Sequence, residues 1–195
     1  MKKIVVFASG SGSNFQSIID ACENGNIPAR ITGLITNKYD IKALERAEKH
    51  QIPSKVLRKS DFNSIEEYES DLQTQLTEWN PDLIALAGYL QKIPDAIVQS
   101  YPDRILNIHP SLLPKYGGKG FYGLNVHRAV VEAGEVETGC TVHLVNEVYD
   151  EGEILGQVVV DVFATDSPED VAARVLKEEH RLYPLIIEKH LEILD

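Results

Sequence analysis

Residues 4–14, IVVFASGSGSN, decide the fold of this chain. Residues 4–8 are apolar throughout, which indicates a strand buried on both faces rather than one with a solvent-exposed face. Glycines then mark a tight turn, and residues 14–24 carry apolar side chains at the helical spacing of Phe15, Ile18, Ile19 and Cys22. A buried strand that turns at glycines into a helix is the unit from which parallel α/β sheets are built.

The same alternation of strands and helices continues along the first half of the chain. Further strands are predicted at residues 31–36, 54–57, 82–87 and 105–108, and helices at 42–50, at 94–101 and from a capping-box pattern at 64–67 towards Trp79. We therefore predict an α/β fold, a Rossmann-like open and mostly parallel sheet with helices on both faces.

The second half has a different character. Residues 110–124 are rich in Gly, Pro and Lys and are predicted to form a loop, which a helix at 126–133 follows. Strands are predicted at 141–145 and 155–163, on either side of a turn at 150–153. Ser167 and the proline and acids after it predict the start of a final helix. Since no repeat, low-complexity tract or linker divides the chain, we expect a single domain spanning 1–195.

Composition narrows the classes of partner. The 195 residues carry a formal charge of −11, which argues against an extended nucleic-acid footprint but not against one bound phosphate. No apolar run approaches the roughly 20 residues of a membrane span, so no membrane partner is expected. Cys22 and Cys140 lie far apart and are predicted to be free thiols in a reducing, cytoplasmic compartment. No histidine pair has metal-ligand spacing with a third ligand, so no metal is expected.

The glycine-rich turn is the first candidate site. Backbone N–H groups of such a turn, at the start of a helix, suit a phosphate. Phe15 occupies the place of the third glycine of a dinucleotide fingerprint, and no ribose-binding acid follows the second strand, where residues 36–38 are Thr-Asn-Lys. A monophosphate is therefore favoured over a dinucleotide, and the alternative is a tight turn capped by Ser and Asn.

The second candidate site lies at the end of the fifth strand. Asn107 and His109 are two residues apart and so fall on the same side of the chain. Ligands of open parallel sheets collect at the carboxyl ends of the strands. An amide and an imidazole there can both donate hydrogen bonds to an oxygen that becomes negative during acyl transfer. The alternative is a histidine whose hydrogen bonds are satisfied at the strand end.

The third candidate is Asp150, in the late turn. An acid near a histidine favours the protonated ring; an ordinary Asp-x-Gly turn is the alternative. His127 and His143 approach the same site unless they lie on a helix surface and a strand face. The neighbours Glu178, Glu179 and His180 are typical of a solvated charge cluster, and His50, His180 and His190 are interpreted as structural.

Several segments together resemble the folate-dependent glycinamide ribonucleotide formyltransferases, small single-domain enzymes of purine synthesis. The matching segments keep the family's order and cover most of the chain. They are IVVFASGSGSN (4–14), DLIALAGYLQKI (82–93), ILNIHPSLLPKY (105–116), GCTVHLV (139–145), YDEGEILGQ (149–157) and ARVLKEEHRLYP (173–184). Relatives that act on methionyl-tRNA carry a further domain after the catalytic one, and a related deformylating hydrolase carries one before it; neither is expected here.

The resemblance implies roles for individual residues. The expected catalytic residues are Asn107, His109 and Asp150, with Thr141 and His143 as support. The residues expected to bind the ribonucleotide are Gly12, Ser13, Asn14 and Glu179. The residues expected to line the folate pocket are Leu90, Gln91, Lys92, Ile93, Asn107, Asn146, Glu147, Val148, Tyr149 and Asp150.

The chain departs from this family at two places. Ile65 and Gln91 stand where some relatives carry arginines, so no folate-binding arginine is expected, and Lys92 is the alternative cation for the folate's acidic tail. The loop at 117–123 is longer than in the shorter-looped members. Either it covers the site as a lid or it is a surface variation.

The reaction that the resemblance implies moves the formyl group of 10-formyltetrahydrofolate directly to the amine of the ribonucleotide, through a tetrahedral intermediate. Asp150 is then expected to raise the pKa of His109, so that a protonated His109 and Asn107 stabilise the oxyanion. Hydrolysis of 10-formyltetrahydrofolate, a different amine acceptor and a non-catalytic nucleotide-binding module are the rival functions. The expected oligomeric state is a monomer or a homodimer.

Overall fold

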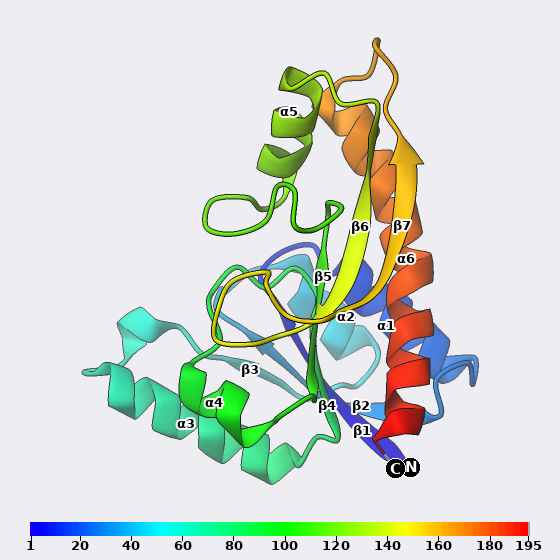
Figure 1. Cartoon of the computed structure of the whole chain (residues 1–195). Coiled ribbons are helices and arrows are strands. Elements are labelled where there is room, and N and C mark those ends of the chain that lie inside the picture. Colours follow the sequence, from blue (N-terminus) through cyan, green and yellow to red (C-terminus); the bar gives the residue numbers. More distant parts are fainter. Residues whose placement is uncertain (195) are drawn as a thin grey trace.

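The computed structural model describes residues 1–194 and contains one seven-stranded sheet (Figure 1). Its strand order is β3-β2-β1-β4-β5-β6-β7; neighbours from β3 to β5 run parallel, and β6 runs antiparallel to both β5 and β7. The strands are β1 (Lys2–Ala8), β2 (Ala29–Thr36), β3 (Ser54–Val56), β4 (Leu83–Leu86), β5 (Ile105–His109), β6 (Glu137–Leu144) and β7 (Ile154–Asp161). The predicted open, mostly parallel sheet is confirmed.

Helices cover both faces of this sheet (Figure 1). The helices are α1 (Ser13–Glu23), α2 (Lys42–Lys49), α3 (Ile65–Trp79), α4 (Asp95–Ser100), α5 (Leu124–Glu132) and α6 (Pro168–Ile193), with a 3-10 turn η1 (Lys59–Asp61). Ile4 and Val6 pack in the core beneath α1, α2 and α6, while Val5 and Phe7 pack in the core beneath α3 and α4. Two buried faces explain why the first strand is apolar throughout.

The long helix α6 is anchored at its start and in its middle. At its start, Ser167 and Asp170 form a complete capping box, which satisfies backbone N–H groups that have no helical partner. In its middle, the buried hydroxyl of Tyr183 lies 3.1 Å from the Leu86 carbonyl and 3.0 Å from the Leu106 carbonyl, on β4 and β5. These contacts hold α6 beside the strand ends that carry the site.

The capping box predicted at residues 64–67 forms only in part. The Ser64 side chain accepts from the Glu67 N–H, as the pattern requires. The Glu67 carboxylate, however, accepts from the backbone and side-chain amides of Asn63, not from the Ser64 N–H. The return bond is therefore displaced by one residue towards the N-terminus.

The topology gathers several strand ends at one place. The strand order reverses between β1 and β4, which is the switch point where ligands of open α/β sheets bind.

The predicted late strands are also confirmed. Strand β6 begins at Glu137, earlier than expected, because Glu137 and Thr138 already pair with Asp161 and Val160 of β7. None of the helices in the described chain is long and apolar enough to cross a membrane.

Candidate active site

A cavity of about 620 Å³ opens at the carboxyl ends of β1, β4 and β5, within the size range of small-molecule sites. Its wall includes the turn before α1, the segment after β4, the loop after β5, the turn between β6 and β7, and part of α6. Segments from nearly the whole length of the chain therefore face one space.

The turn before α1 forms one end of this cavity. Gly12 has a φ of +69°, and a Cβ there would lie 2.9 Å from Ala43, so only glycine fits without strain. Arg46 holds the turn from outside, since its Nε donates to the Ser11 carbonyl at 2.9 Å. The first N–H groups of α1, from Ser13 onward, have no helical acceptors and border the cavity, as an anion site requires.

Asn14 and Glu179 meet on the same wall, although 165 residues separate them. The Asn14 Nδ2 donates to Glu179 Oε2 at 2.7 Å, and both side chains are buried. Burial raises the pKa of Glu179 to about 7, despite the opposing hydrogen bond from Asn14. The interpretation of residues 178–180 as a solvated cluster is thus wrong for Glu179, because α6 turns this carboxyl into the cavity wall.

Asn107 projects from β5 towards His143 on β6. Its Nδ2 lies 3.0 Å from His143 Nε2, and His143 Nδ1 donates to the Leu144 carbonyl at 2.7 Å. In the neutral ring, Nε2 therefore accepts from the amide of Asn107. Among residues 1–194, Asn107 Nδ2 has no second partner, and Asn107 borders the cavity, so its other N–H can meet a ligand there.

His109 ends β5 and is 4% exposed. Its Nε2 donates to the Tyr116 carbonyl at 2.8 Å, and its Nδ1 lies 3.6 Å from Asp150 Oδ2. Burial lowers the pKa of His109 below its ordinary value. Asp150 raises this pKa, as expected, and so does the Tyr116 carbonyl, but burial outweighs both, so the expected protonated resting ring is wrong. The ring is held in place by acceptors on both sides while remaining hard to protonate.

Asp150 occupies the turn between β6 and β7 with a φ of +56°, a region that aspartate tolerates. Its carboxylate accepts from the Gly118 N–H at 2.8 Å and lies 3.5 Å from His143 Nε2. Burial alone would raise the pKa of Asp150, but the nearby His143 and His109 rings and the Gly118 N–H together lower it. This aspartate therefore contributes negative charge between two imidazoles.

The segments predicted to line a folate pocket border the cavity at its other end. Leu90 to Ile93, Asn146, Val148 and Tyr149 all contribute to the wall. Glu147 does not, because its carboxylate turns away and accepts from Gln99 Nε2 at 2.8 Å. Lys92 borders the cavity with its Nζ paired to Asp95 Oδ1 at 2.6 Å. Ile65 lies outside the wall.

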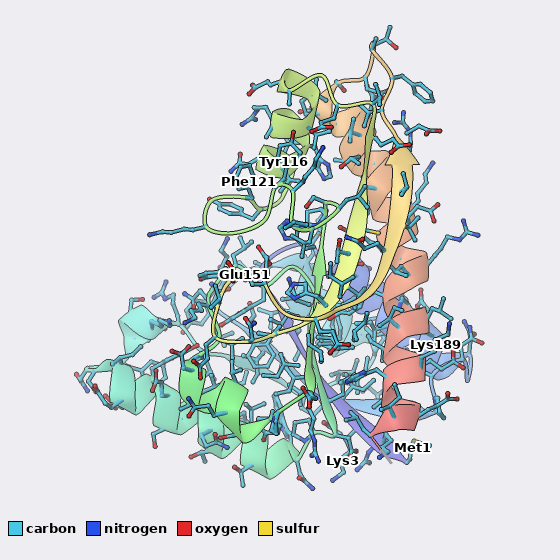
Figure 2. The ribbon with its side chains drawn as sticks, viewed as in Figure 1. Met1, Lys3, Tyr116, Phe121, Glu151 and Lys189 are labelled. Atoms are coloured by element: carbon cyan, nitrogen blue, oxygen red, sulfur yellow. The ribbon has the colours of Figure 1, made fainter. Side chains whose placement is uncertain are left out.

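The loop after β5 closes one side of the cavity, and residues 118–123 contribute to its wall. Figure 2 shows Tyr116 and Phe121 on this loop, where their rings meet edge to face with centroids 5.9 Å apart. Because the same loop supplies the Tyr116 carbonyl to His109 and the Gly118 N–H to Asp150, it contacts two of the three predicted catalytic residues. No sequence pattern signals such backbone contacts.

Two further predicted residues differ in their relation to the cavity. Thr141 lies beneath the turn after His109, where its hydroxyl donates to the Ser111 carbonyl at 2.6 Å and accepts from the Leu113 N–H. His127 is buried at the cavity wall on α5, so its alternative placement on a helix surface is wrong. Among residues 1–194 there is no group of His, Cys, Asp and Glu arranged to hold a metal ion.

Comparison with known proteins places the chain among formyl-transferring enzymes. Residues 2–187 match the family model described as formyl transferase. A phosphoribosylglycinamide formyltransferase of Haemophilus influenzae is 46% identical over 187 residues, covering 96% of this chain and 86% of that protein. The chloroplastic phosphoribosylglycinamide formyltransferase of Arabidopsis thaliana is also 46% identical, and this chain spans 64% of its length. The crystal structure of glycinamide ribonucleotide transformylase 1 from Symbiobacterium toebii superposes with a TM-score of 0.92 at 38% identity, covering 98% of this chain and 88% of that one.

Proposed function

The chain belongs to the formyl transferase family, and we propose that it transfers the formyl group of 10-formyltetrahydrofolate to the amine of N1-(5-phospho-D-ribosyl)glycinamide, a step of purine (IMP) biosynthesis. One observation carries this assignment: an anion-binding helix start and an Asn-His-Asp group face the same cavity. The relatives named for this activity support it. We treat residues 1–195 as one formyltransferase domain.

The proposal divides the cavity between two substrates. Gly12, Ser13 and Asn14 bind the phosphate through their backbone N–H groups. Glu179 accepts from ribose hydroxyls, because its carboxylate faces the same wall. The apolar and backbone groups of residues 90–93, 146 and 148–150 suit a flat heteroaromatic ring, so they bind the folate.

The chemistry assigned to the site needs no covalent enzyme intermediate. 10-Formyltetrahydrofolate supplies the formyl carbon; the neutral amine of the ribonucleotide attacks it, and the bond to N10 breaks. Asn107 donates its free amide N–H to the formyl oxygen as that oxygen becomes negative. His109 donates from Nε2, in competition with the Tyr116 carbonyl.

Asp150 completes the proposed group by stabilising positive charge on His109 during the reaction. The proton lost by the attacking nitrogen passes to the leaving N10 through these groups, with water as relay. Burial lowers the resting pKa of His109, so in this scheme the ring carries a second proton only while the adjacent oxygen is negative. The donor at the oxyanion is therefore strongest in the transition state.

We also propose a cytoplasmic location and a monomer or homodimer. Cys22 and Cys140 are free thiols, and burial raises the pKa of each, to about 11 and about 12, which suits unreactive thiols in a reducing compartment.

A steady-state assay tests the proposed function. With 10-formyltetrahydrofolate present, deformylated folate should form only when the ribonucleotide is added. Equal product without ribonucleotide would instead establish a hydrolase, and no product with folded protein would refute formyl transfer to this acceptor. His109→Ala should lower turnover about a hundred- to a thousand-fold while ribonucleotide binding is retained.

A further inference from the structure

Two buried side chains at the main cavity each carry a polar atom without a hydrogen-bond partner. Four such side-chain atoms occur among the described residues: Asn14 Oδ1, His127 Nδ1, Thr138 Oγ1 and His180 Nε2. Two of these side chains, Asn14 and His127, border the main cavity, and both are more than nine-tenths buried. Unpartnered buried groups are rare in native proteins and call for an explanation; for the Asn14 oxygen, a ligand in the cavity supplies one.

The arrangement of acceptors around Asn14 defines which ligand groups fit there. Its Nδ2 is occupied by Glu179, so the amide oxygen is the group that remains open. This oxygen and the Glu179 carboxyl are both acceptors. They match hydroxyl donors such as those of a ribose, and they do not match a phosphate.

His127 offers the opposite polarity. Its Nδ1 is shielded from solvent and has no partner, and a buried N–H without an acceptor is rarer in proteins than a buried acceptor without a donor. The neutral ring therefore keeps its proton on Nε2, the other ring nitrogen, which also has no hydrogen-bond partner among residues 1–194. Burial lowers the pKa of His127 to about 4, so the ring stays neutral and Nε2 presents one N–H donor.

The position of His127 indicates which part of a ligand it meets. It lies on α5, which packs against α6, the helix that carries Glu179 on the ribonucleotide side of the cavity. It also lies close enough to His109 for the two rings to influence each other's protonation. A ligand atom that contacts His127 is therefore between the ribose end and the reacting end.

We propose that His127 binds the acceptor substrate, donating from Nε2 to the glycinamide carbonyl oxygen and so positioning the neighbouring amine for attack. This inference rests on the proposed function. The carbonyl carbon is bonded directly to the carbon that bears the amine, and its oxygen is the acceptor that lies between the ribose and the reacting nitrogen. Acceptors at Asn14 and Glu179 meet the hydroxyls, and the donor at His127 meets the carbonyl.

Truncation of the ligand separates this role from a general effect on the fold. Calorimetric titration with glycinamide ribonucleotide and with ribose 5-phosphate, which lacks the glycinamide, is carried out on wild type and His127→Phe. The variant keeps a ring of similar size without nitrogen. We expect its Kd for the ribonucleotide to rise about tenfold, while its Kd for ribose 5-phosphate changes less than about twofold.

Three further variants complete the experiment. His127→Gln places an amide N–H near the position of Nε2 and should restore most of the affinity for the ribonucleotide. His127→Leu also removes both ring nitrogens and takes the place of His127→Phe if that variant does not fold. His180→Phe, which removes an unpartnered nitrogen that does not border this cavity, should leave both dissociation constants unchanged. In the steady-state assay, the KM for the ribonucleotide should rise in His127→Phe and the KM for 10-formyltetrahydrofolate should not.

The outcomes separate the two proposals. Equal changes for the two ligands, or none, in a folded His127→Phe protein would overturn the role of His127. Failure of wild type to bind glycinamide ribonucleotide would overturn the proposed acceptor itself. Loss confined to the glycinamide-bearing ligand, with recovery in His127→Gln, would establish the contact.

Discussion

Glu179 makes the stability of this protein depend on pH in a way that one substitution should remove. The carboxyl is 7% exposed, and burial raises its pKa from the ordinary 4.5 to about 7. Between these two pH values the folded state binds a proton that the unfolded state has lost, so the free energy of unfolding falls as pH rises. The difference, 7 − 4.5, corresponds to about 3 kcal/mol at roughly 1.4 kcal/mol per unit.

Glu179→Gln should abolish this contribution, because the amide has the shape of the protonated acid and its oxygen still accepts from Asn14. Near pH 4.5 the variant and wild type should unfold at the same urea concentration. At pH 8 the variant should be more stable than wild type by about 3 kcal/mol. Other groups titrate over this range, but they contribute equally to both proteins and cancel in the difference.

Urea titrations of both proteins at pH 5, 6, 7 and 8 give the measurement. Glu178→Gln is the matched control: the adjacent carboxyl is less buried, so its removal should leave the pH dependence as in wild type. Parallel pH profiles for wild type and Glu179→Gln would refute the reasoning. The stabilised variant should also bind the ribonucleotide more weakly, because an amide oxygen accepts from hydroxyls less strongly than a carboxylate does.

Three further changes have defined outcomes. Asp150→Asn should reduce turnover at least about a hundred-fold, and it should lower the pKa of His109 further, as followed by NMR titration of the ring, because the aspartate is the charge that raises that pKa; an unchanged titration would contradict their coupling. Gly12→Ala should destabilise the protein by about 1–3 kcal/mol and weaken ribonucleotide binding, since its φ is +69° and its Cβ would press on Ala43; a melt and affinity like those of wild type would argue against the strained turn. Tyr183→Phe should cost about 1 kcal/mol in urea unfolding with both KM values unchanged, because the hydroxyl contacts only the Leu86 and Leu106 carbonyls; an altered KM would show that α6 had moved.

Local patterns in the sequence were sufficient for the elements and for the place of the site. Runs such as residues 4–8 and 83–86 are apolar at every position, and only a sheet covered on both faces requires this. Gly12 marks the turn because its backbone conformation and its distance from α2 exclude a side chain, which is a constraint set by nearby atoms. The run at 105–108 predicts a strand that ends near His109, and a period of two puts Asn107 and His109 on the same side of it; β5 does end at His109.

The properties of the site that the sequence did not determine depend on contacts between distant segments. The sequence by itself specified the α/β sheet, the glycine turn before the first helix and the strand end that carries Asn107 and His109, because each follows from residues within one or two turns of chain. Only the tertiary structure decided that Glu179 is buried against Asn14, that His127 faces the cavity, and that His109 has a lowered pKa. These properties come from desolvation and from partners up to 165 residues away, and both are established only when the packed chain excludes water from the site.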